Sequence, residues 1–410
     1  MTASVGIEKI GVYPCSLALS MNTLCEARGQ DANHIRDIMM IDERSLNPLW
    51  EDPVTMAVNA ANSILTEEDR QHIELLVVAS ESGVDYEKPL STWVQCNTGL
   101  SPNCRNFEIK HACYGGTAAL QLAACWLASG LARNGKALII STDQSRTHFG
   151  KPWEFVMGAG SAAFLLSNEP RILELELGKN GYWTNEISDL TRPTGSVETG
   201  NSETSLVSYL DALEAAFDHF LSRVPEAADY DRYFQRHVYH MPFGGIAWRA
   251  HKTLLRRSES VGNKEAWANF QRKGLAALDH VRRMGATYSS STFIGLLGLI
   301  EGTPDLQPGE RVSMFSYGSG CCAEFYCGRI CPDAKAEVSE VKLRKKLDAR
   351  RALNISEYEA VESQRTRWVD CGNYEVPLDG LDGWYDRHYR NRRLLTFRGM
   401  KDFYRQYEWS

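Results

Sequence analysis

The sequence lacks any uninterrupted apolar run near the roughly 18 residues that a membrane-spanning helix needs. Residues 1–10 lack the basic segment and apolar core of a secretory signal, so we expect a cytoplasmic protein without membrane contact. Basic residues are not in excess, since 45 Lys and Arg stand against 52 Asp and Glu and give a net charge of -7. This balance gives no general attraction to polyanions and argues against nucleic acid as a partner.

The eleven cysteines include no Cys-x2-Cys pair of the kind that holds zinc. Their number is odd and they are scattered along a long chain, which favours reduced thiols over a disulfide framework. Four of them, Cys321, Cys322, Cys327 and Cys331, lie in an apolar strand-like run and are expected to pack in the core. We therefore expect neither a metal site nor a resident cofactor.

With 410 residues, 43% of them hydrophobic and 24% charged, the chain is longer than one hydrophobic core usually supports. Strand-like and helix-like segments alternate along it, which predicts a layered α/β fold. Each half ends in two antiparallel strand candidates, so we expect an internal duplication, with one half over residues 1–170 and the other over 171–410. No low-complexity linker separates the halves, and we expect them to share one body.

Apolar periodicity predicts the individual elements. Strands are expected over residues 5–12, 73–80, 137–142, 161–166, 171–177, 236–240, 311–317 and 322–330, and helices over 53–64, 205–222, 247–257, 264–284 and 291–301. The tail after Pro332 carries five basic residues between positions 344 and 351. We interpret them as the solvated face of a helix rather than a binding patch.

A strand-like run over residues 107–112 breaks at Cys113, Gly115 and Gly116 and continues as an Ala/Leu-rich helix. A cysteine at a helix start faces unpaired backbone N–H groups and the positive end of the helix dipole, which favour the nucleophilic thiolate. The glycines permit a tight turn, so that the backbone N–H of Cys113 can also face a substrate oxygen. The alternative is a small apolar residue packed at a strand-to-helix junction.

Glu81 and His240 also stand at the ends of predicted strands. Because the carboxyl ends of strands meet at one edge in layered α/β folds, we expect Glu81, Cys113 and His240 to lie together. Taken singly, Glu81 could be a surface carboxylate and His240 a hydrogen-bonded residue at a strand end. Their shared position favours a catalytic set but names no substrate.

Five segments resemble motifs of hydroxymethylglutaryl-CoA synthases, occur in the order of that family and span nearly the whole chain. They are residues 79–85 (ASESGVD), 107–117 (FEIKHACYGGT), 192–195 (RPTG), 240–243 (HMPF) and 315–320 (FSYGSG). The resemblance implies the thiolase fold, with five alternating αβαβα layers built from two similar halves. It also implies a homodimer.

The resemblance gives the matching residues roles. Cys113 would take an acetyl group from a thioester, Glu81 would act as general base and then as general acid, and His240 would position the acceptor. The backbone N–H groups of Cys113 and Ser316 would form an oxyanion hole. Substrate-binding or positioning roles are expected for Asp143, Gly160, Asp189, Trp248, Tyr288 and Tyr317.

The sequence departs from the family pattern beyond the fourth motif. Where the CoA-using members have lysines, this chain has Gly245 and Trp248, so cationic contacts for the phosphates of CoA are missing. The family's Gly-Asn pair reads Gly285-Ala286, which removes an amide that would contact the acceptor. Residues 197–206 (VETGNSETSL) resemble the subgroup of bacterial polyketide assembly lines, whose substrates are held on acyl carrier proteins. Rim arginines that could take over the cationic contacts are Arg36, Arg44 and Arg146.

The leading hypothesis is a C–C bond-forming acyltransferase of polyketide β-branching. It would condense the acetyl group of acetyl-Cys113 with a β-ketoacyl thioester on an acyl carrier protein, and hydrolysis would release a 3-hydroxy-3-carboxymethyl acyl-carrier protein. Donor and acceptor carrier proteins would be its partners, with substrates held on phosphopantetheine. The alternatives are a hydroxymethylglutaryl-CoA synthase of isoprenoid synthesis, a ketoacyl synthase of the same fold, and a protein that binds carrier proteins without catalysis.

Overall fold

The computed structural model describes residues 4–133, 135–144, 149–195 and 197–410, and a nine-stranded sheet runs through its centre. The strands lie in the order β11 (Arg236–Tyr239), β12 (Arg311–Gly318), β13 (Cys322–Ile330), β8 (Leu173–Thr184), β1 (Gly6–Tyr13), β7 (Gly160–Ser167), β6 (Lys136–Asp143), β4 (Ile73–Ala79) and β5 (Arg105–Ile109). β4 pairs in parallel with β5 and β6, and β11 pairs in parallel with β12, so that each end of the sheet has parallel strands.

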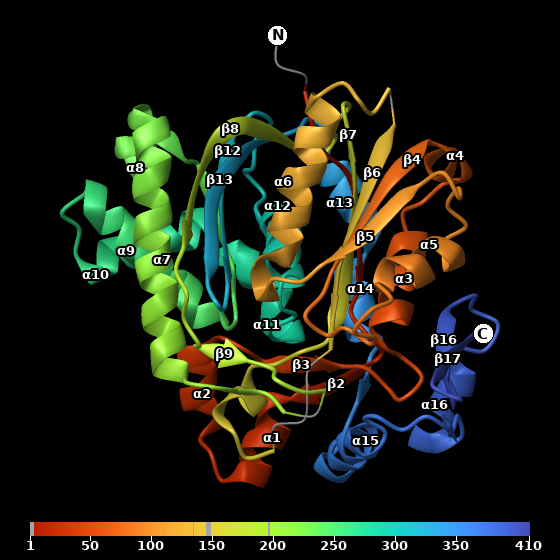
Figure 1. The fold of residues 1–410 in the computed structure, drawn as a ribbon. Helices are drawn as coiled ribbons and strands as arrows, with labels where there is room; N and C mark the ends of the chain where they lie inside the picture. Colours follow the sequence, from red (N-terminus) through yellow and green to blue (C-terminus); the bar gives the residue numbers. More distant parts are fainter. Residues whose placement is uncertain (1–3, 134, 145–148, 196) are drawn as a thin grey trace.

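The sheet consists of two parts that are joined where β1 pairs with β8, at Gly6–Glu174 and Ile7–Leu173. Helices lie between the two parts and outside them (Figure 1). The inner helices are α6 (Gly115–Ala128) and α12 (Ser290–Gly302), and the outer ones include α7 (Ser202–Arg223) beside β8 and α3 (Pro53–Asn62) beside β6 and β7. The five alternating αβαβα layers that the resemblance implied are therefore present.

The composition of the central helices explains why they occupy the middle layer. Every residue of α12 from Ser290 to Ile300 is buried, and most of its side chains are apolar or small. A helix that is apolar on all sides has no face for solvent and must be enclosed. β4 is likewise buried at every residue except Glu74, as expected for a strand covered on both faces.

Two predicted elements differ from the structure. The single helix expected over 264–284 is wrong, because the chain forms α10 (Asn263–Lys273), a 3-10 turn (Leu275–Leu278) and α11 (Val281–Met284). The break falls at Gly274, where a Cβ would lie 2.9 Å from the Phe270 ring. The strand expected over 171–177 instead runs to Thr184, because β13 pairs with it as far as Cys322–Thr184.

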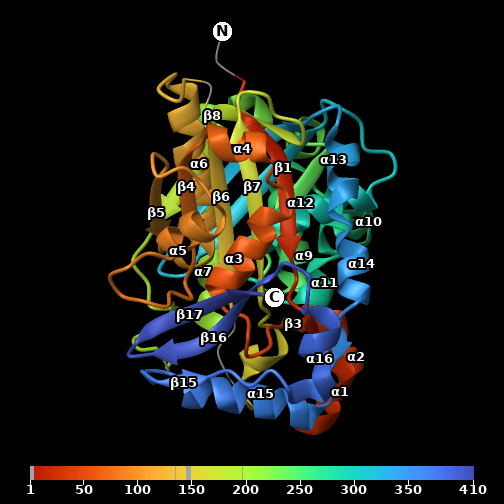
Figure 2. The same cartoon turned by 90° about the vertical axis from the view of Figure 1, so that its right-hand side faces the viewer.

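Two three-stranded sheets, a two-stranded sheet of β9 (Leu190–Thr191) and β10 (Thr199–Gly200), and a C-terminal unit were not predicted. β2 (Leu17–Ser20), β3 (Glu43–Leu46) and β14 (Arg351–Ala352) form one three-stranded sheet, and β15 (Tyr374–Glu375), β16 (Leu395–Lys401) and β17 (Tyr404–Trp409) form the other. The C-terminal unit, residues 355–410, contains the second sheet with α15 (Ile355–Arg367) and α16 (Gly380–His388) and lies at one end of the main body (Figure 2). The Asn59 side chain of α3 fastens it by bonding both the N–H and the carbonyl of Leu395.

The remaining elements surround this frame. They are α1 (Met21–Arg28), α2 (Ala32–Met39), α4 (Glu67–His72), α5 (Leu90–Asn97), α8 (Tyr230–Tyr233), α9 (Gly244–Ser258), α13 (Ala334–Val341) and α14 (Leu343–Asp348). Within the described residues, no helix combines the length and apolarity needed to cross a membrane. All eleven cysteines are free thiols. The boundary predicted at residue 170 falls between β7 and β8 and stays a prediction.

The basic tail is not uniformly solvated as expected. Arg350 is buried, pairs with Glu43 of β3 and donates to the Arg283 carbonyl at 3.0 Å. Lys346 donates to the Val12 carbonyl at 3.2 Å. These residues therefore connect the tail to the main body, and the prediction of a purely solvated face is wrong for them.

Candidate active site

The loop after β4 carries Glu81, and a neighbouring strand holds this loop in place. Asp143, the last residue of β6, is buried, and its Oδ1 accepts hydrogen bonds from the Ser80 hydroxyl and from the backbone N–H groups of Glu81 and Ser82 at 2.9–3.1 Å. The Ser82 hydroxyl also donates to it at 2.9 Å. One carboxylate oxygen therefore determines where the Glu81 backbone lies.

Cys113 lies in a 3-10 turn (Ala112–Tyr114) that connects β5 to α6, as predicted. The end of β12 lies against this turn, since a Cβ at Gly318 would come within 2.7 Å of the Tyr114 N atom and the His111 carbonyl. The Cys113 side chain packs beside a small cluster that includes Met157 and Ala286. The turn therefore joins structure from both parts of the sheet.

The electrostatic environment of Cys113 contradicts the expectation of a resting thiolate. Burial raises the pKa of the Cys113 thiol well above its usual value, and nearby carboxylates of Glu81, Asp143, Asp189 and Glu198 raise it further. The helix dipole, on which the expectation of a thiolate rested, contributes only a fraction of a unit charge. Negative groups brought in from distant parts of the chain outweigh it, so the resting cysteine is a neutral thiol.

His240 follows β11 and is buried. Its backbone N–H donates to the Phe315 carbonyl at 2.7 Å, and its own carbonyl accepts from the Tyr209 hydroxyl at 2.8 Å. Its Nδ1 lies 3.2 Å from the Ser291 hydroxyl. Burial lowers the pKa of the imidazole to about 3, so His240 is neutral at physiological pH.

Several buried polar atoms around these residues make no hydrogen bond within the described part of the chain. They are Glu81 Oε1, Asp143 Oδ2, His240 Nε2 and the Ser316 hydroxyl. Because buried polar groups are almost always satisfied in folded proteins, a group of unsatisfied ones marks a place where a polar ligand completes the bonding. Burial and the neighbouring Asp143 also raise the pKa of Glu81, which suits a residue that both removes and returns a proton.

Asp189 and Tyr317 support each other and the loop after β12. The Tyr317 hydroxyl bonds with Asp189 Oδ2 and Ser208 Oγ, both at 2.8 Å, and Asp189 Oδ1 accepts from the Gly320 N–H at 3.0 Å. Asp189 therefore uses both oxygens within the protein. This geometry favours a positioning role for the pair over direct substrate contact.

Tyr288, Gly160 and Trp248 occupy different places around the site. Tyr288 is buried with a left-handed backbone (φ 53°), and its hydroxyl accepts from Arg192 at 3.3 Å. Gly160 begins β7, where a Cβ would lie 2.8 Å from the Met284 methyl, so close packing accounts for the glycine. Trp248 is half-buried on α9, with its ring 5.1 Å from that of Trp267. Their substrate-binding roles stay predictions.

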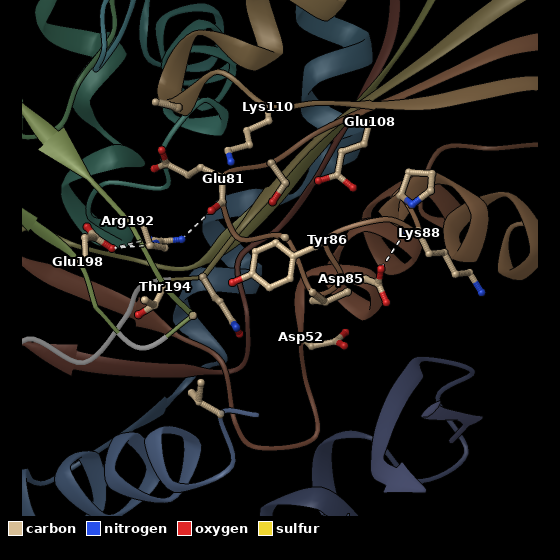
Figure 3. A pocket seen from close by; sticks show the side chains of 18 of the residues that line it. Asp52, Glu81, Asp85, Tyr86, Lys88, Glu108, Lys110, Arg192, Thr194 and Glu198 are labelled. Carbon is tan, nitrogen blue, oxygen red and sulfur yellow. Dashed lines mark hydrogen bonds and ion pairs between the residues drawn. The ribbon is translucent and has the colours of Figure 1, made fainter. Parts of the chain in front are cut away.

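No role was predicted for Arg192 and Glu198. Arg192 donates to the Glu81 carbonyl at 2.6 Å and pairs with Glu198 (Figure 3). The ion pair therefore holds the Glu81 loop at a second point, in addition to Asp143. The only signal in the sequence was that Arg192 begins one of the five motifs, at residues 192–195.

The expected rim arginines also need correction. Arg44 is buried at 1% exposure, where it donates to the Tyr358 hydroxyl at 3.0 Å, and it cannot face a partner. Arg36 is half-exposed and donates to Asn22 and Asn33. Arg146 lies outside the described residues.

A cavity of about 1440 Å³ reaches the site beside Glu81. Figure 3 shows Glu81, Arg192 and Glu198 on one side of it, with Tyr86 and Asp52 farther out. Its wall combines the loop after β4, the segment at 184–198, residues 319–321 and the C-terminal unit. The cavity gives a ligand access to the Glu81 loop from solvent.

Comparisons with known proteins show the family of the chain. The profile of the family "Hydroxymethylglutaryl-coenzyme A synthase C terminal" matches residues 250–379. The polyketide biosynthesis 3-hydroxy-3-methylglutaryl-ACP synthase PksG of Bacillus subtilis is 35% identical over 421 aligned positions, which cover 99% of each chain. A hydroxymethylglutaryl-CoA synthase of Enterococcus faecalis is 32% identical and covers 87% of this chain and 91% of its own.

Solved structures give the same result. The HMG synthase of the curacin biosynthetic pathway superimposes with a TM-score of 0.93 at 36% identity, covering 99% of this chain and all of that one. That enzyme has also been solved in complex with holo, apo and acetyl donor-ACP.

The fold of the solved structures and the identity along the whole chain define the class: an acyl-transferring, C–C bond-forming enzyme of the thiolase superfamily. That Glu81, Cys113 and His240 act together stays a prediction. Within that class, the chain belongs to the hydroxymethylglutaryl-CoA synthase family. The resemblance inferred from five motifs is confirmed.

Proposed function

We propose that the chain is a β-branching synthase of polyketide assembly. It joins the acetyl group of an acetyl-carrier protein to the β-ketone of an acyl chain held on a second carrier protein. The reaction begins when Cys113 Sγ attacks the acetyl thioester, which forms acetyl-Cys113 and releases the pantetheine thiol with the proton that Cys113 loses. Because the resting Cys113 is a thiol, its proton leaves as the thioester reacts rather than beforehand.

Glu81 is the general base and then the general acid of the condensation. Its carboxylate removes a proton from the acetyl methyl group, and the resulting carbon nucleophile attacks the β-ketone of the acceptor. The alkoxide formed takes the proton back from Glu81. Water then hydrolyses the thioester on Cys113, which leaves a 3-hydroxy-3-carboxymethyl acyl thioester on the acceptor carrier and restores the thiol.

His240 and the backbone N–H groups of Cys113 and Ser316 stabilise the reacting oxygens. His240 is neutral and buried, with Nε2 unpartnered among the described residues, so it can bond to the acceptor oxygen without adding a full charge. Donors that are aligned in advance toward developing negative charge stabilise a transition state strongly. We expect side chains and backbone to supply all the chemistry, with no resident cofactor or metal.

The observation that carries the choice of a carrier protein over free CoA is the packing at Gly245. A Cβ there would lie 1.9 Å from the Ile38 carbonyl, so no side chain fits where CoA-using enzymes have a lysine. Trp248 packs against Trp267 and Phe270, and the Lys252 ammonium lies over its ring at 5.5 Å. Neither position presents a cation to an adenosine phosphate, whereas phosphopantetheine on a protein carries a single phosphate.

The test compares two acetyl donors at equal concentration. The chain is incubated with acetyl-CoA or with an acetyl-carrier protein, and acetyl-Cys113 is followed by the mass of the intact protein, with Cys113→Ala as the blank. We expect loading from the carrier protein to be about tenfold faster or more, the size of one lost charge-assisted contact. Comparable or faster loading from acetyl-CoA would support an ordinary hydroxymethylglutaryl-CoA synthase instead.

The proposal includes a cytoplasmic homodimer. β5 ends the nine-stranded sheet, and no described strand pairs with its outer edge. On the neighbouring α6, Leu122 is 54% exposed. An unpaired strand edge beside exposed apolar residues is typical of a two-fold interface between copies. Sedimentation as a monomer at micromolar concentration would contradict it.

A further inference from the structure

The cavity beside Glu81 is larger than the proposed condensation requires. The reacting atoms are one acetyl methyl group and one ketone, and the acceptor of a CoA-dependent family member, acetoacetyl, ends in a methyl group directly after that ketone. Pockets for small ligands usually measure about 300–1,000 Å³. The cavity here measures about 1440 Å³, so most of its volume serves something other than the reacting atoms.

The cavity also lies away from the side where Trp248 marks the expected entrance of the pantetheine arm. Glu81 and Arg192 line it, together with the loop after β4 and residues of the C-terminal unit (Figure 3). None of the described residues that line it belongs to the stretch 236–300, which contains His240 and α9. Glu81 therefore lies between the cavity and the expected entrance of the pantetheine arm.

Among the described residues that line the cavity, acidic side chains outnumber basic ones by nine to five. Three of the five cations are already paired with a carboxylate: Arg192 with Glu198, Arg365 with Glu362 and Arg405 with Asp52. A paired guanidinium would have to give up its partner to bind a phosphate, and the other two cations, Lys88 and Lys110, belong to a wall with an excess of negative charge. The cavity is thus poorly suited to a nucleotide.

The apolar part of the wall suits a chain. The apolar residues that line the cavity include Val84, Leu190, Val369 and Phe397. Two further lining residues are aromatic and exposed, Tyr86 at 94% and Phe403 at 72%. Figure 3 shows the Tyr86 ring beside the space between Arg192 and Asp85. Aromatic side chains exposed to this extent contribute nothing to the core and can pack along a ligand.

We propose that this cavity holds the distal part of the acceptor, from the carbon after the β-ketone outward. The inference rests on the proposed function and makes it more specific: the substrate is an uncharged acyl chain much longer than acetoacetyl. The pantetheine arm reaches the site from the Trp248 side, and the chain passes Glu81 into the cavity. Tyr86 and Val369 determine which chain lengths are accepted.

The test uses two acceptors on the same carrier protein, acetoacetyl and a long-chain β-ketoacyl group such as β-ketododecanoyl. Val369→Trp should lower kcat/KM about tenfold or more for the long chain and leave it within about twofold for acetoacetyl. Tyr86→Ala should raise KM several-fold for the long chain alone, and Tyr86→Phe should keep the wild-type value. Because Tyr86 is almost fully exposed, its replacement leaves the fold intact even where Val369→Trp does not.

Acetylation of Cys113 is measured in each variant, because it distinguishes an error in the assignment of the cavity from an error in the proposed function. Equal losses with both acceptors would overturn the assignment of the cavity to the chain. Slower acetylation in the variants would overturn it as well, because it would make the cavity the entrance of the donor arm. Wild-type protein that acetylates but condenses neither acceptor would contradict the proposed function instead.

Discussion

Two regions of the candidate site differ in charge. One, the carboxylate side, contains Glu81, Asp143, Asp189 and Glu198, whose negative charges raise the pKa of the Cys113 thiol. The other, the histidine side, contains His240 after the end of β11, where burial keeps the imidazole neutral.

The difference shows where a proton can be exchanged near neutral pH. On the carboxylate side, burial and mutual repulsion raise the pKa of Glu81 and bring that of Asp143 to about 7, so a proton can be both taken up and returned there. On the histidine side, the low pKa of His240 keeps the imidazole neutral, and His240 offers only hydrogen bonds. Proton transfer therefore belongs to the carboxylate side, and alignment of the acceptor belongs to the histidine side.

The largest expected effect comes from removing the base of the carboxylate side. Glu81→Ala should leave acetylation of Cys113 measurable and lower the rate of condensation by about 10²–10⁴-fold, the usual contribution of general acid–base catalysis. Glu186→Ala is the matched control, because Glu186 is an exposed carboxylate on the same cavity wall. Acetylated Glu81→Ala protein that condenses at the wild-type rate would assign the base to another residue.

A smaller effect is expected from the histidine side when the pH falls. The pKa of His240 is about 3 in the folded protein and 6.5 in the unfolded chain, so the unfolded chain binds the proton first and stability falls as the pH drops below 6.5. Between pH 6.5 and pH 5 this one residue should cost about 2 kcal/mol of unfolding free energy. Urea unfolding at several pH values measures it. His240→Gln should flatten the pH dependence by that amount, and an unchanged slope would show that His240 is protonated in the fold.

The smallest effect tests the charge of the carboxylate side alone. Asp143→Asn keeps an oxygen that can accept the bonds from Ser80, Glu81 and Ser82 but removes the negative charge. The pKa of Cys113 should fall, and iodoacetamide should alkylate the thiol several-fold faster at pH 8. Ser82→Ala, which loosens the loop without changing charge, is the control. A pH profile that Asp143→Asn leaves unmoved would mean that burial alone keeps Cys113 protonated.

Much of the frame was predictable from local patterns, and the same patterns point to three candidate catalytic residues. Apolar runs such as 73–80 and 137–142 are long enough to mark buried strands by themselves. Polar residues directly after such runs are expected at one edge of the sheet, and on this basis the sequence predicts Glu81, Cys113 and His240 as one catalytic set. The five motifs then identified the family.

Other features depend on contacts between distant segments. The helix break at Gly274 follows from contact with Phe270, and a periodicity that continues across the glycine does not show it. Arg44 and Arg350 look like surface residues in the sequence, yet both are buried because Tyr358 and Glu43 meet them there. Arg192 gains its role only by reaching the Glu81 carbonyl, 111 positions away.

By itself, the sequence determined the layered fold and the family and gave three candidate catalytic residues, because strand periodicity, turn chemistry and motif order are local properties. Only the tertiary structure decided the protonation state of Cys113, the bracing of Glu81 by Asp143 and Arg192, and the cavity that reaches past Tyr86. These depend on burial and on electric fields that fall off over a few ångströms in space. Distance along the chain says nothing about such separations.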